Sequence, residues 1–290
     1  MTISYNGLGS NGRIGNQMFQ YASLRGIAKN RGFDFLIPPE NNLGHTNYCL
    51  FECFKMSGVK ESNKGFSDFT EQHDDQGHFN FSKELFETCK DNINLNGYYQ
   101  TEKYFLNAKE EVRKDFEFKD EIANECKSFI DSIGQTPIFL HVRRGDYVRV
   151  QQWHPLMPVE YYKNALSKFD KNVPVVVLSD DFEWCQQQEI FKPDRFFISE
   201  SDVKFNNKMK MGDGKMEQSL VGFWDMCLMS LCDGAIIANS TFSWWGAWLQ
   251  KNPNKKVITP NPKNWFGPMY SHWNMDDIIP ETWKVLVWLE

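Results

Sequence analysis

This chain of 290 residues lacks several features that would assign it to a broad class of protein at once. Its formal net charge is −6, whereas a general nucleic-acid binder carries a basic excess, so that class is excluded. No stretch approaches the ~18 consecutive apolar residues of a membrane span, and the first residues lack the apolar run of a signal peptide. We therefore expect a cytoplasmic protein without an integral membrane segment, which leaves peripheral association with the inner face of the membrane open.

Patterns typical of disulfides and metal sites are also missing. The seven cysteines are an odd number and include no Cys-x-x-Cys pair, which indicates reduced thiols rather than a disulfide framework or a zinc site. Many nucleotide-sugar transferases hold a divalent ion with an Asp-x-Asp pair, and this sequence contains none. Its histidines show no ligand spacing either. We expect neither a bound metal nor a resident cofactor.

Predicted strands and helices alternate along the chain. The strands are expected at 2–6, 33–38, 92–100, 137–144, 173–181, 194–199, 235–239 and 255–260, and the helices at 14–32, 102–118, 120–134, 158–169, 182–188, 216–234 and 240–250. Residues 41–81 have no clear period and indicate short turns, a lid or edge strands. Alternation of this kind is typical of an α/β fold whose parallel sheets are covered on both faces. It predicts two halves, residues 1–133 and 134–290.

Four polar loops follow predicted strands, where open parallel sheets place their ligand sites. They are residues 9–17, 143–146, 180–181 and 239–243. Four such loops at equivalent positions are more than chance placement gives, so we expect functional residues in them.

The second of these loops begins with two arginines. Arg143 and Arg144 end the predicted strand 137–144, and a guanidinium meets a phosphate through two parallel hydrogen bonds. Successive side chains of a strand point to opposite sides. One arginine at most can therefore face a ligand, while the other braces the loop, with Asp146 as a candidate partner. From spacing alone, a structural ion pair explains the arginines about equally well.

The first and last of these loops each lead into a predicted helix, whose N-terminus favours an anion. The spacing of Gly12 and Gly15 fits neither the Walker loop nor cleanly the dinucleotide fingerprint, and a tight turn explains it as well. Ser240 or Thr241 can bind a phosphate or simply cap the last helix. That helix also carries three tryptophans, for which we expect core or interdomain packing: Trp244, Trp245 and Trp248.

Three motifs together resemble one enzyme family. They are GRIGNQMFQYA at 12–22, HVRRGDY at 141–147 and NSTFSWWGAWL at 239–249. Their order and separation are similar to those of the bacterial α-1,2-fucosyltransferases, glycosyltransferase family 11, over nearly the whole chain. The resemblance implies a GT-B-type architecture of two Rossmann-like halves facing a cleft, with the acceptor side in 1–133 and GDP-fucose bound by 134–290.

The family resemblance also implies an activity. It is the metal-independent, inverting transfer of L-fucose from GDP-β-L-fucose to the 2-hydroxyl of a galactoside. The partners are then GDP-fucose and a galactose-terminated oligosaccharide of a bacterial surface polysaccharide.

The motifs carry implied roles for individual residues. Arg143 matches the arginine that holds the β-phosphate of the donor, and His141 matches a residue near the guanine. Asp225 aligns by position with an acidic reader of guanine, although solvated charge is the usual state of a helix carboxylate. The remaining matches are Thr241, Phe242 and Ser243 in the loop around the phosphates, and Asn16 and Gln17 in the first motif, which faces the cleft from the other half.

Inversion also requires a base that takes the proton of the acceptor hydroxyl. The candidates are Asp146 and His154. The neighbouring arginines favour an ionised Asp146 that orients them, whereas His154 lies in a segment expected to border the acceptor. Neither the residues nor the resemblance decides between the two.

Three other functions stay open. Fucosyltransferases of α-1,6 or O-linked specificity share the His-x-Arg-Arg core. A Rossmann oxidoreductase would need a cleaner glycine fingerprint and an acidic residue after the second strand, where only Glu40 follows, beyond two prolines. A glycan-binding module would have little use for an arginine pair and two Rossmann-like halves.

Overall fold

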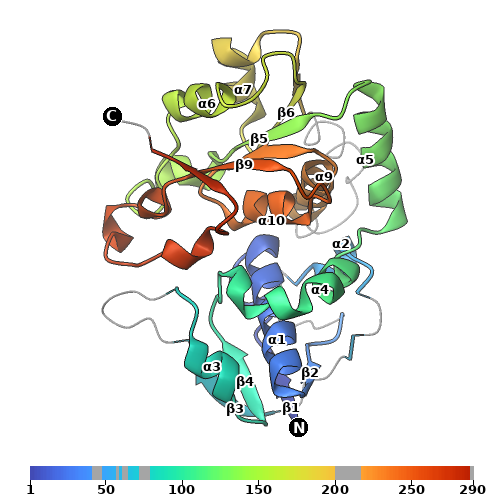
Figure 1. Cartoon of the computed structure of the whole chain (residues 1–290), viewed down its shortest axis with the longest axis vertical. Coiled ribbons are helices and arrows are strands. Elements are labelled where there is room, and N and C mark those ends of the chain that lie inside the picture. The colour runs from blue at the N-terminus through green and yellow to red at the C-terminus, as the bar shows by residue number, and fades with distance from the viewer. Residues whose placement is uncertain (41–47, 57–58, 61–64, 72–78, 200–216, 288–290) are drawn as a thin grey trace. The chain divides into compact units, whose positions relative to one another are not determined.

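The structure is a computed structural model, and it describes the chain except for residues 41–47, 57–58, 61–64, 72–78, 200–216 and 288–290 (Figure 1). The chain divides into two compact units. The N-terminal unit comprises Met1–Lys119 and His272–Pro280, and the C-terminal unit comprises Asp120–Ser271 and Glu281–Glu290. Each unit is built around its own parallel sheet, as the alternation of strands and helices predicted.

The N-terminal unit contains a four-stranded sheet in which all neighbouring strands are parallel. In order across the sheet, the strands are β2 (Asp34–Leu36), β1 (Thr2–Ser4), β4 (Ile93–Asn96) and β3 (Ser67–Thr70). The helices are α1 (Ile14–Arg31), α2 (Leu50–Cys53), α3 (Lys83–Thr88) and α4 (Lys109–Asp115), and the 3₁₀ turns are η1 (Glu102–Tyr104), η2 (Leu106–Ala108) and η7 (Asp276–Ile278).

Helix α1 confirms the predicted helix 14–32 almost to the residue. Gly32 follows it with left-handed backbone (φ 66°) and donates its N–H to the carbonyls of Ala28 and Lys29. A residue with a Cβ adopts this conformation at a cost, so glycine is the usual residue where a helix ends in this way.

The predicted helix 102–118 is wrong in its first half, where η1 and η2 precede α4. The chain passes very close to α1 at this point. A Cβ on Gly26 would lie 2.6 Å from the Cα of Phe105. This close packing bends the backbone away from a regular helix, and apolar spacing does not reveal it.

Segment 41–81 is described in part. It contains α2 and β3, and β3 is an edge strand of the sheet, which confirms one of the structures expected there. The rest of this segment, for which short turns or a lid were the other expectations, falls largely on residues outside the described part of the chain.

The C-terminal unit contains a six-stranded parallel sheet. In order, the strands are β10 (Lys284–Leu286), β9 (Lys256–Pro260), β8 (Gly234–Ile236), β5 (Ile138–Val142), β6 (Val175–Ser179) and β7 (Phe196–Ile198). The helices are α5 (Asp120–Ser132), α6 (Val159–Leu166), α7 (Phe182–Gln187), α9 (Glu217–Ser230) and α10 (Thr241–Leu249), and the 3₁₀ turns are η3 (Gly145–Arg149), η4 (Glu189–Phe191), η5 (Pro262–Asn264) and η6 (Pro268–Tyr270). Among the strands and α-helices described in this unit, the short strand β10 is the one that was not predicted.

Strand β5 is buried along its whole length, and its side chains alternate between two cores. Ile138 and Leu140 pack with Tyr161 of α6. His141 faces the other way, toward Phe242 of α10, with ring centroids 5.7 Å apart. Helices α6 and α7 thus cover one face of the sheet, and α9 and α10 cover the other (Figure 1).

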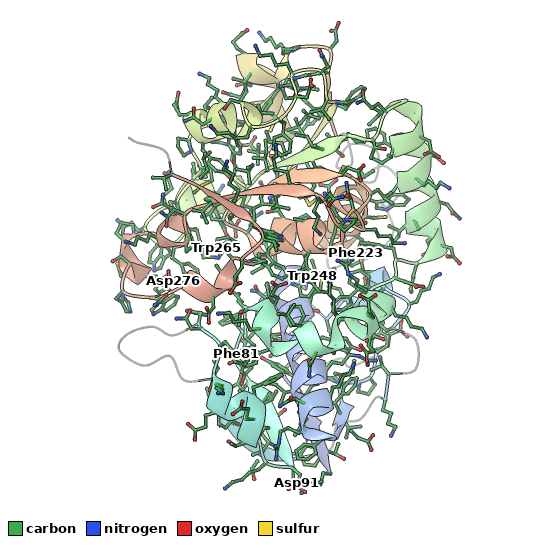
Figure 2. All side chains as sticks on the ribbon, viewed as in Figure 1. Phe81, Asp91, Phe223, Trp248, Trp265 and Asp276 are labelled. Atoms are coloured by element: carbon green, nitrogen blue, oxygen red, sulfur yellow. The ribbon has the colours of Figure 1, made fainter. Side chains whose placement is uncertain are left out.

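The three tryptophans of α10 lie in the core of the C-terminal unit, which confirms the packing prediction. Trp248 and Phe223 of α9 are both buried (Figure 2). The two helices pack closely at Gly246, where a Cβ would lie 2.6 Å from the Cβ of Met229.

The chain divides at a different place from the predicted boundary after residue 133. Helix α5 belongs to the C-terminal unit because it packs on α9, where the thiol of Cys126 donates to the carbonyl of Trp224 (3.5 Å). Residues 272–280 return to the N-terminal unit, where the carboxylate of Asp277 accepts from the N–H of Phe81 (2.8 Å). Such a return leaves no trace in the periodicity of the sequence.

All seven cysteines are buried free thiols. None of the helices in the described part of the chain has the length and apolar content needed to cross a lipid bilayer.

Candidate active site

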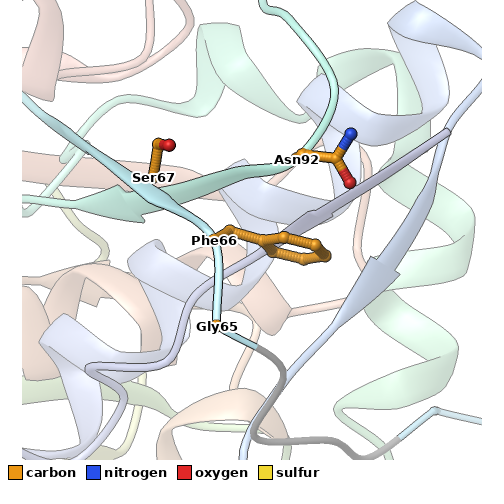
Figure 3. Close-up of a pocket in the computed structure, with 4 residues that line it drawn as sticks. All are labelled: Gly65, Phe66, Ser67 and Asn92. Atoms are coloured by element: carbon orange, nitrogen blue, oxygen red, sulfur yellow. The ribbon is translucent and has the colours of Figure 1, made fainter.

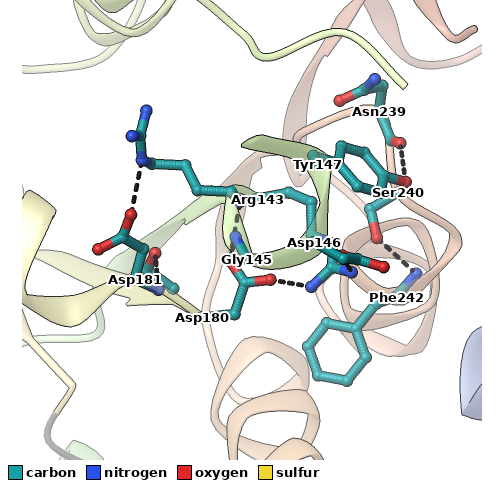
Figure 4. Close-up of polar contacts among 11 residues, drawn as sticks. Arg143, Gly145, Asp146, Tyr147, Asp180, Asp181, Asn239, Ser240 and Phe242 are labelled. Carbon is teal, nitrogen blue, oxygen red and sulfur yellow. Dashed lines mark hydrogen bonds and ion pairs between the residues drawn. The ribbon is translucent and has the colours of Figure 1, made fainter. Parts of the chain in front are cut away.

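The motif at 141–147 begins at the end of β5 and continues into the loop that follows this strand, where Arg143 lies near Asp146 and Asp180 (Figure 4). Arg143 pairs with Asp146 of the same loop and with Asp180 at the end of β6. The Nε of Arg144 lies 2.8 Å from the Oδ2 of Asp181. The two arginines thus have different carboxylate partners, and Asp146, expected to brace one of them, pairs with Arg143.

Asp180 also holds the backbone of this loop. Its Oδ1 accepts from the N–H groups of Arg144 (2.8 Å) and Gly145 (3.1 Å), while its Oδ2 meets the guanidinium of Arg143. A Cβ on Gly145 would lie 2.9 Å from the Cγ of Asp180, so this approach requires glycine. The sequence marked 180–181 as a polar loop after a buried strand, but it did not reveal these bonds.

Tyr147 connects the second motif to the third. The guanidinium of Arg143 lies 4.7 Å from the centre of the Tyr147 ring. The ring of His154 is also stacked on that of Tyr147, with centroids 4.6 Å apart and an interplanar angle of 14°. The Tyr147 hydroxyl donates to the carbonyl of Asn239 (3.3 Å) (Figure 4).

His154 is half-buried beside this loop. Its Nδ1 has no hydrogen-bond partner among the described residues. Burial lowers the pKa of His154 below its usual 6.5, Asp146 opposes this effect, and Arg143 adds to it. The imidazole is therefore neutral at pH 7 and able to accept a proton.

His141 is almost fully buried at the end of β5, on the side of α10. Burial, with a smaller contribution from Arg143, lowers its pKa to about 3. Its Nδ1 also lacks a partner among the described residues. The side chain can offer a ligand neutral hydrogen bonds but no charge.

The third motif begins α10 at the carboxyl end of β8. Ser240 caps the helix, and its Oγ accepts from the N–H of Phe242 (3.4 Å). Capping was one of the two roles predicted for this position. Ser243 is buried, and its hydroxyl donates to the carbonyls of Ala238 (3.5 Å) and Ser240 (3.3 Å). Thr241 and Phe242 are half-buried, so they are the predicted residues of this loop with side chains nearer to solvent.

Asp225 lies on α9 and is 7% exposed. Its Oδ1 accepts from the hydroxyl of Ser199, which follows β7 (3.3 Å). The interpretation of this carboxylate as a solvated helix charge is therefore wrong.

Asn16 and Gln17 belong to the N-terminal unit. The Oδ1 of Asn16 accepts from the side-chain amide of Gln100 (3.0 Å). Gln17 is fully buried, where it donates to the carbonyl of Gly12 (3.4 Å) and accepts from the N–H of Cys49 (3.2 Å). Gln17 thus holds the backbone before α1, while Asn16 is half-buried.

A surface hollow of about 440 Å³ lies elsewhere in the N-terminal unit, lined by Gly65, Phe66, Ser67 and Asn92 (Figure 3). It lies at the amino ends of β3 and β4, opposite the edge where parallel sheets place their sites. We assign it no part in the active site. Within the described residues, no group of three or more His, Cys, Asp or Glu side chains is placed to hold a metal ion.

Comparison with known proteins decides the family of this chain. The model of glycosyl transferase family 11 matches residues 2–283. The chain belongs to glycosyltransferase family 11. The family predicted from the three motifs is confirmed.

Two of the proteins similar to this chain are named as transferases of different sugars, colitose and fucose. The chain is 30% identical over 299 residues to an Alpha-1,2-colitosyltransferase of Escherichia coli, covering 94% of this chain and 95% of that protein. It is 28% identical over 253 residues to Galactoside alpha-(1,2)-fucosyltransferase 1 of Homo sapiens, covering 82% of this chain and 64% of the human enzyme. The chain thus spans about two thirds of the human relative.

Solved structures confirm the GT-B class of this family 11 glycosyltransferase. NodZ alpha-1,6-fucosyltransferase soaked with GDP-fucose matches with a TM-score of 0.55 at 16% identity, covering 91% of this chain and 96% of NodZ. The apo-form of POFUT1 matches with a TM-score of 0.51 at 13% identity, covering 89% and 97%. At these identities the likeness concerns the fold alone.

Proposed function

We propose that this family 11 glycosyltransferase transfers L-fucose from GDP-β-L-fucose to the 2-hydroxyl of a galactoside, with inversion and without a metal. The observation that carries this proposal is the guanidinium of Arg143, fixed by two carboxylates at the carboxyl end of β5. The names of the E. coli and human relatives, both of α-1,2 specificity, support the linkage.

Arg143 would stabilise the departing diphosphate. As the bond between fucose and the β-phosphate breaks, negative charge grows on the phosphate oxygens, and a fixed cation lowers the barrier by stabilising that charge. A guanidinium has five N–H donors, so Asp146 and Asp180 leave others for the phosphate. The first turn of α10, which begins at Thr241, would add backbone N–H groups.

Buried polar groups of the C-terminal unit would recognise the base. A carboxylate at Asp225 can accept from N1–H and the 2-amino group of guanine, two donors that adenine lacks. His141 would contribute a neutral hydrogen bond close to Arg143. A site built on buried hydrogen bonds rejects an analogue that leaves them unpaired. We expect Asp225→Ala to reduce the preference for GDP over ADP in a titration, and an unchanged preference would remove this role.

The general base, which takes the proton of the acceptor hydroxyl, would be His154. Asp146 is already engaged with Arg143, which suits an orienting role. His154 is stacked beside the same loop, is neutral at pH 7 and has an Nδ1 without a partner among the described residues. It would take the proton of the acceptor hydroxyl as the new glycosidic bond forms.

Transfer of colitose is the second candidate, because a colitosyltransferase matches 94% of this chain. Colitose differs from fucose by lacking the 3-hydroxyl. A comparison of the two donors therefore tests the contact that the enzyme makes with this one hydroxyl. The test compares kcat/KM for GDP-fucose and GDP-colitose with lactose as acceptor. We expect GDP-fucose to be preferred by at least about tenfold, the effect of one lost hydrogen bond, and a preference for GDP-colitose would favour the second candidate.

A further inference from the structure

A buried polar network lies at the carboxyl edge of the N-terminal sheet, outside the donor site. Glu71 follows β3 and is 7% exposed. Its carboxylate accepts from the N–H groups of Tyr98 (2.6 Å) and Tyr99 (3.1 Å), which follow β4. Tyr5, after β1, accepts from the N–H of Gly97 (2.9 Å) through its hydroxyl. These side chains fix the turn at residues 97–100.

The backbone of this turn adopts an unusual conformation. Tyr99 has a φ of 51° and Gly97 a φ of 153°, and a Cβ on Gly97 would lie 2.6 Å from the Oε2 of Glu71. A side-chain residue in the left-handed region persists only where its surroundings hold it there, and such positions gather at functional sites.

A polar stripe on α1 holds the turn from the other side. Asn16, Gln20 and Ser23 follow the helical spacing that puts them on one face. Gln20 donates to the carbonyl of residue 97 (3.0 Å) and Ser23 to that of residue 99 (3.2 Å). Gln100, in turn, donates to the Oδ1 of Asn16 (3.0 Å). The turn therefore presents an amide pair, Gln100 and Asn16, at the start of α1.

Two acceptors in this network remain unused. Gln20 is fully buried and Gln100 is 5% exposed. The Oε1 of each has no hydrogen-bond partner among the described residues. A buried acceptor without a donor is unfavourable and needs a reason. A ligand that carries several hydroxyl groups would supply donors.

Aromatic rings adjoin the same turn. Tyr98 and Trp273 are both half-buried, and both rings contact Phe79, with centroid distances of 6.1 Å for Tyr98 and 4.9 Å for Trp273. Trp273 arrives on the segment 272–280 that returns to this unit. Uncharged amides beside half-exposed rings suit a neutral sugar, whose hydroxyls meet the amides while its C–H face covers a ring.

We propose that Asn16, Gln100, Tyr98 and Trp273 form a subsite for a pyranose ring of the acceptor glycan, with Glu71 as the positioning residue of the turn. The identification of this sugar as the acceptor rests on the proposed function. The binding of a neutral pyranose does not.

Binding of lactose, a β-galactoside, tests the subsite directly. It is measured by calorimetric titration at saturating GDP in the parent, in Gln100→Met and in Trp273→Leu. Methionine keeps the volume of Gln100 and removes its amide. We expect the Kd for lactose to rise about tenfold in each variant while the affinity for GDP is unchanged. In Glu71→Gln we likewise expect a higher Kd for lactose and an unchanged affinity for GDP. The transfer rate at saturating lactose should stay unchanged.

Gln250→Met is the matched control. Gln250 is also buried, and its amide donates to the carbonyls of Met229 (3.1 Å) and Gly234 (3.0 Å) in the C-terminal unit. This variant should lower the Tm and leave lactose affinity unchanged. If Gln100→Met does not fold, Trp273→Leu at its half-buried position decides.

Three results would overturn the subsite: no lactose binding by the parent, lactose affinity within twofold of the parent in the folded variants, or an equal loss in Gln250→Met. A parent that binds lactose but transfers no fucose contradicts the proposed function and leaves the subsite standing.

Discussion

Arg143 lies between two carboxylates, and this fixes the direction of its guanidinium. A contact of Asp146 with one of the two arginines was predicted, without deciding which arginine it would be. The second carboxylate was not, because Asp180 comes from the neighbouring strand, 37 residues further along the chain. Long-range partners of this kind depend on strand order, which a single sequence does not state.

Arg143→Lys should lose most activity and keep its fold. Lysine retains the charge but not the planar fork of donors. The loss of one such contact in the transition state costs about 2–4 kcal/mol, so kcat/KM should fall roughly 30- to 1000-fold. Arg149→Lys, an exposed position in the same loop, is the control and should stay within twofold. Activity of Arg143→Lys within a few-fold of the parent would show that Arg143 is structural.

His154→Gln tests the base through the pH profile of kcat/KM for the acceptor. A base must be deprotonated, so the rate falls as pH drops through its pKa. Because burial lowers the pKa of His154, the acid limb of the parent should lie below pH 6.5. The variant should lose this limb and about 10²–10⁴-fold in rate. A full rate with the same limb would exclude His154, and loss of turnover in Asp146→Asn with intact GDP affinity would then assign the base to Asp146.

At the scale of elements, the loop after β5 depends on a glycine. Gly145→Ala would push a Cβ against the carboxylate of Asp180, which holds two backbone N–H groups and Arg143. We expect a loss of about 1–3 kcal/mol in stability and at least a tenfold weaker affinity for GDP by titration. Gly65→Ala, where a Cβ would meet nothing within 4 Å, should change neither. An unchanged GDP affinity in Gly145→Ala would separate the loop from donor binding.

The turn after β4 predicts a dependence of stability on pH. Burial raises the pKa of Glu71 to about 7, although the N–H groups of Tyr98 and Tyr99 oppose the shift. The folded state therefore holds the proton more tightly than the unfolded chain. The stabilisation that comes from protonated Glu71 is complete below the pKa of the unfolded chain, near 4.5, and is lost as pH rises through the folded pKa of about 7.

Glu71→Gln removes this titration. In urea unfolding, the free energy of the parent relative to the variant should decline between pH 4.5 and 7.5, by roughly 1–3 kcal/mol. A difference that stays constant or grows over this range would show that Glu71 is charged in the folded protein throughout.

The ends of helices could be predicted from the sequence where a local residue, such as a terminal glycine or a capping serine, determines them. Helix α1 ends at Gly32, and Ser240 caps α10, as the sequence indicated. The helix expected at 102–118 failed because the contact between Gly26 and the backbone at Phe105 is tertiary. Helix α9 ends at Ser230, four residues before the predicted end at 234, and Gly234 begins β8 instead.

At the scale of the whole molecule, the two sheets were predictable and the path of the chain between the units was not. Helix α5 joins the C-terminal unit, and residues 272–280 return to the N-terminal unit. That return brings Trp273 against Phe79, whose ring also contacts Tyr98 of the turn at 97–100. Part of the proposed acceptor subsite therefore comes from nearly the other end of the sequence. Periodicity and motif spacing report local structure, and neither records such a crossing.

The most direct test of the proposed function is the structure of the product formed in excess chelator. The chain is incubated with GDP-β-L-fucose and lactose, and the linkage and anomeric configuration of the trisaccharide are determined by NMR. The account predicts an α-linked fucose on O2 of galactose, formed at the same rate with and without chelator. A fucose on another hydroxyl, a β-linked product, or a rate that requires Mg²⁺ or Mn²⁺ would contradict it.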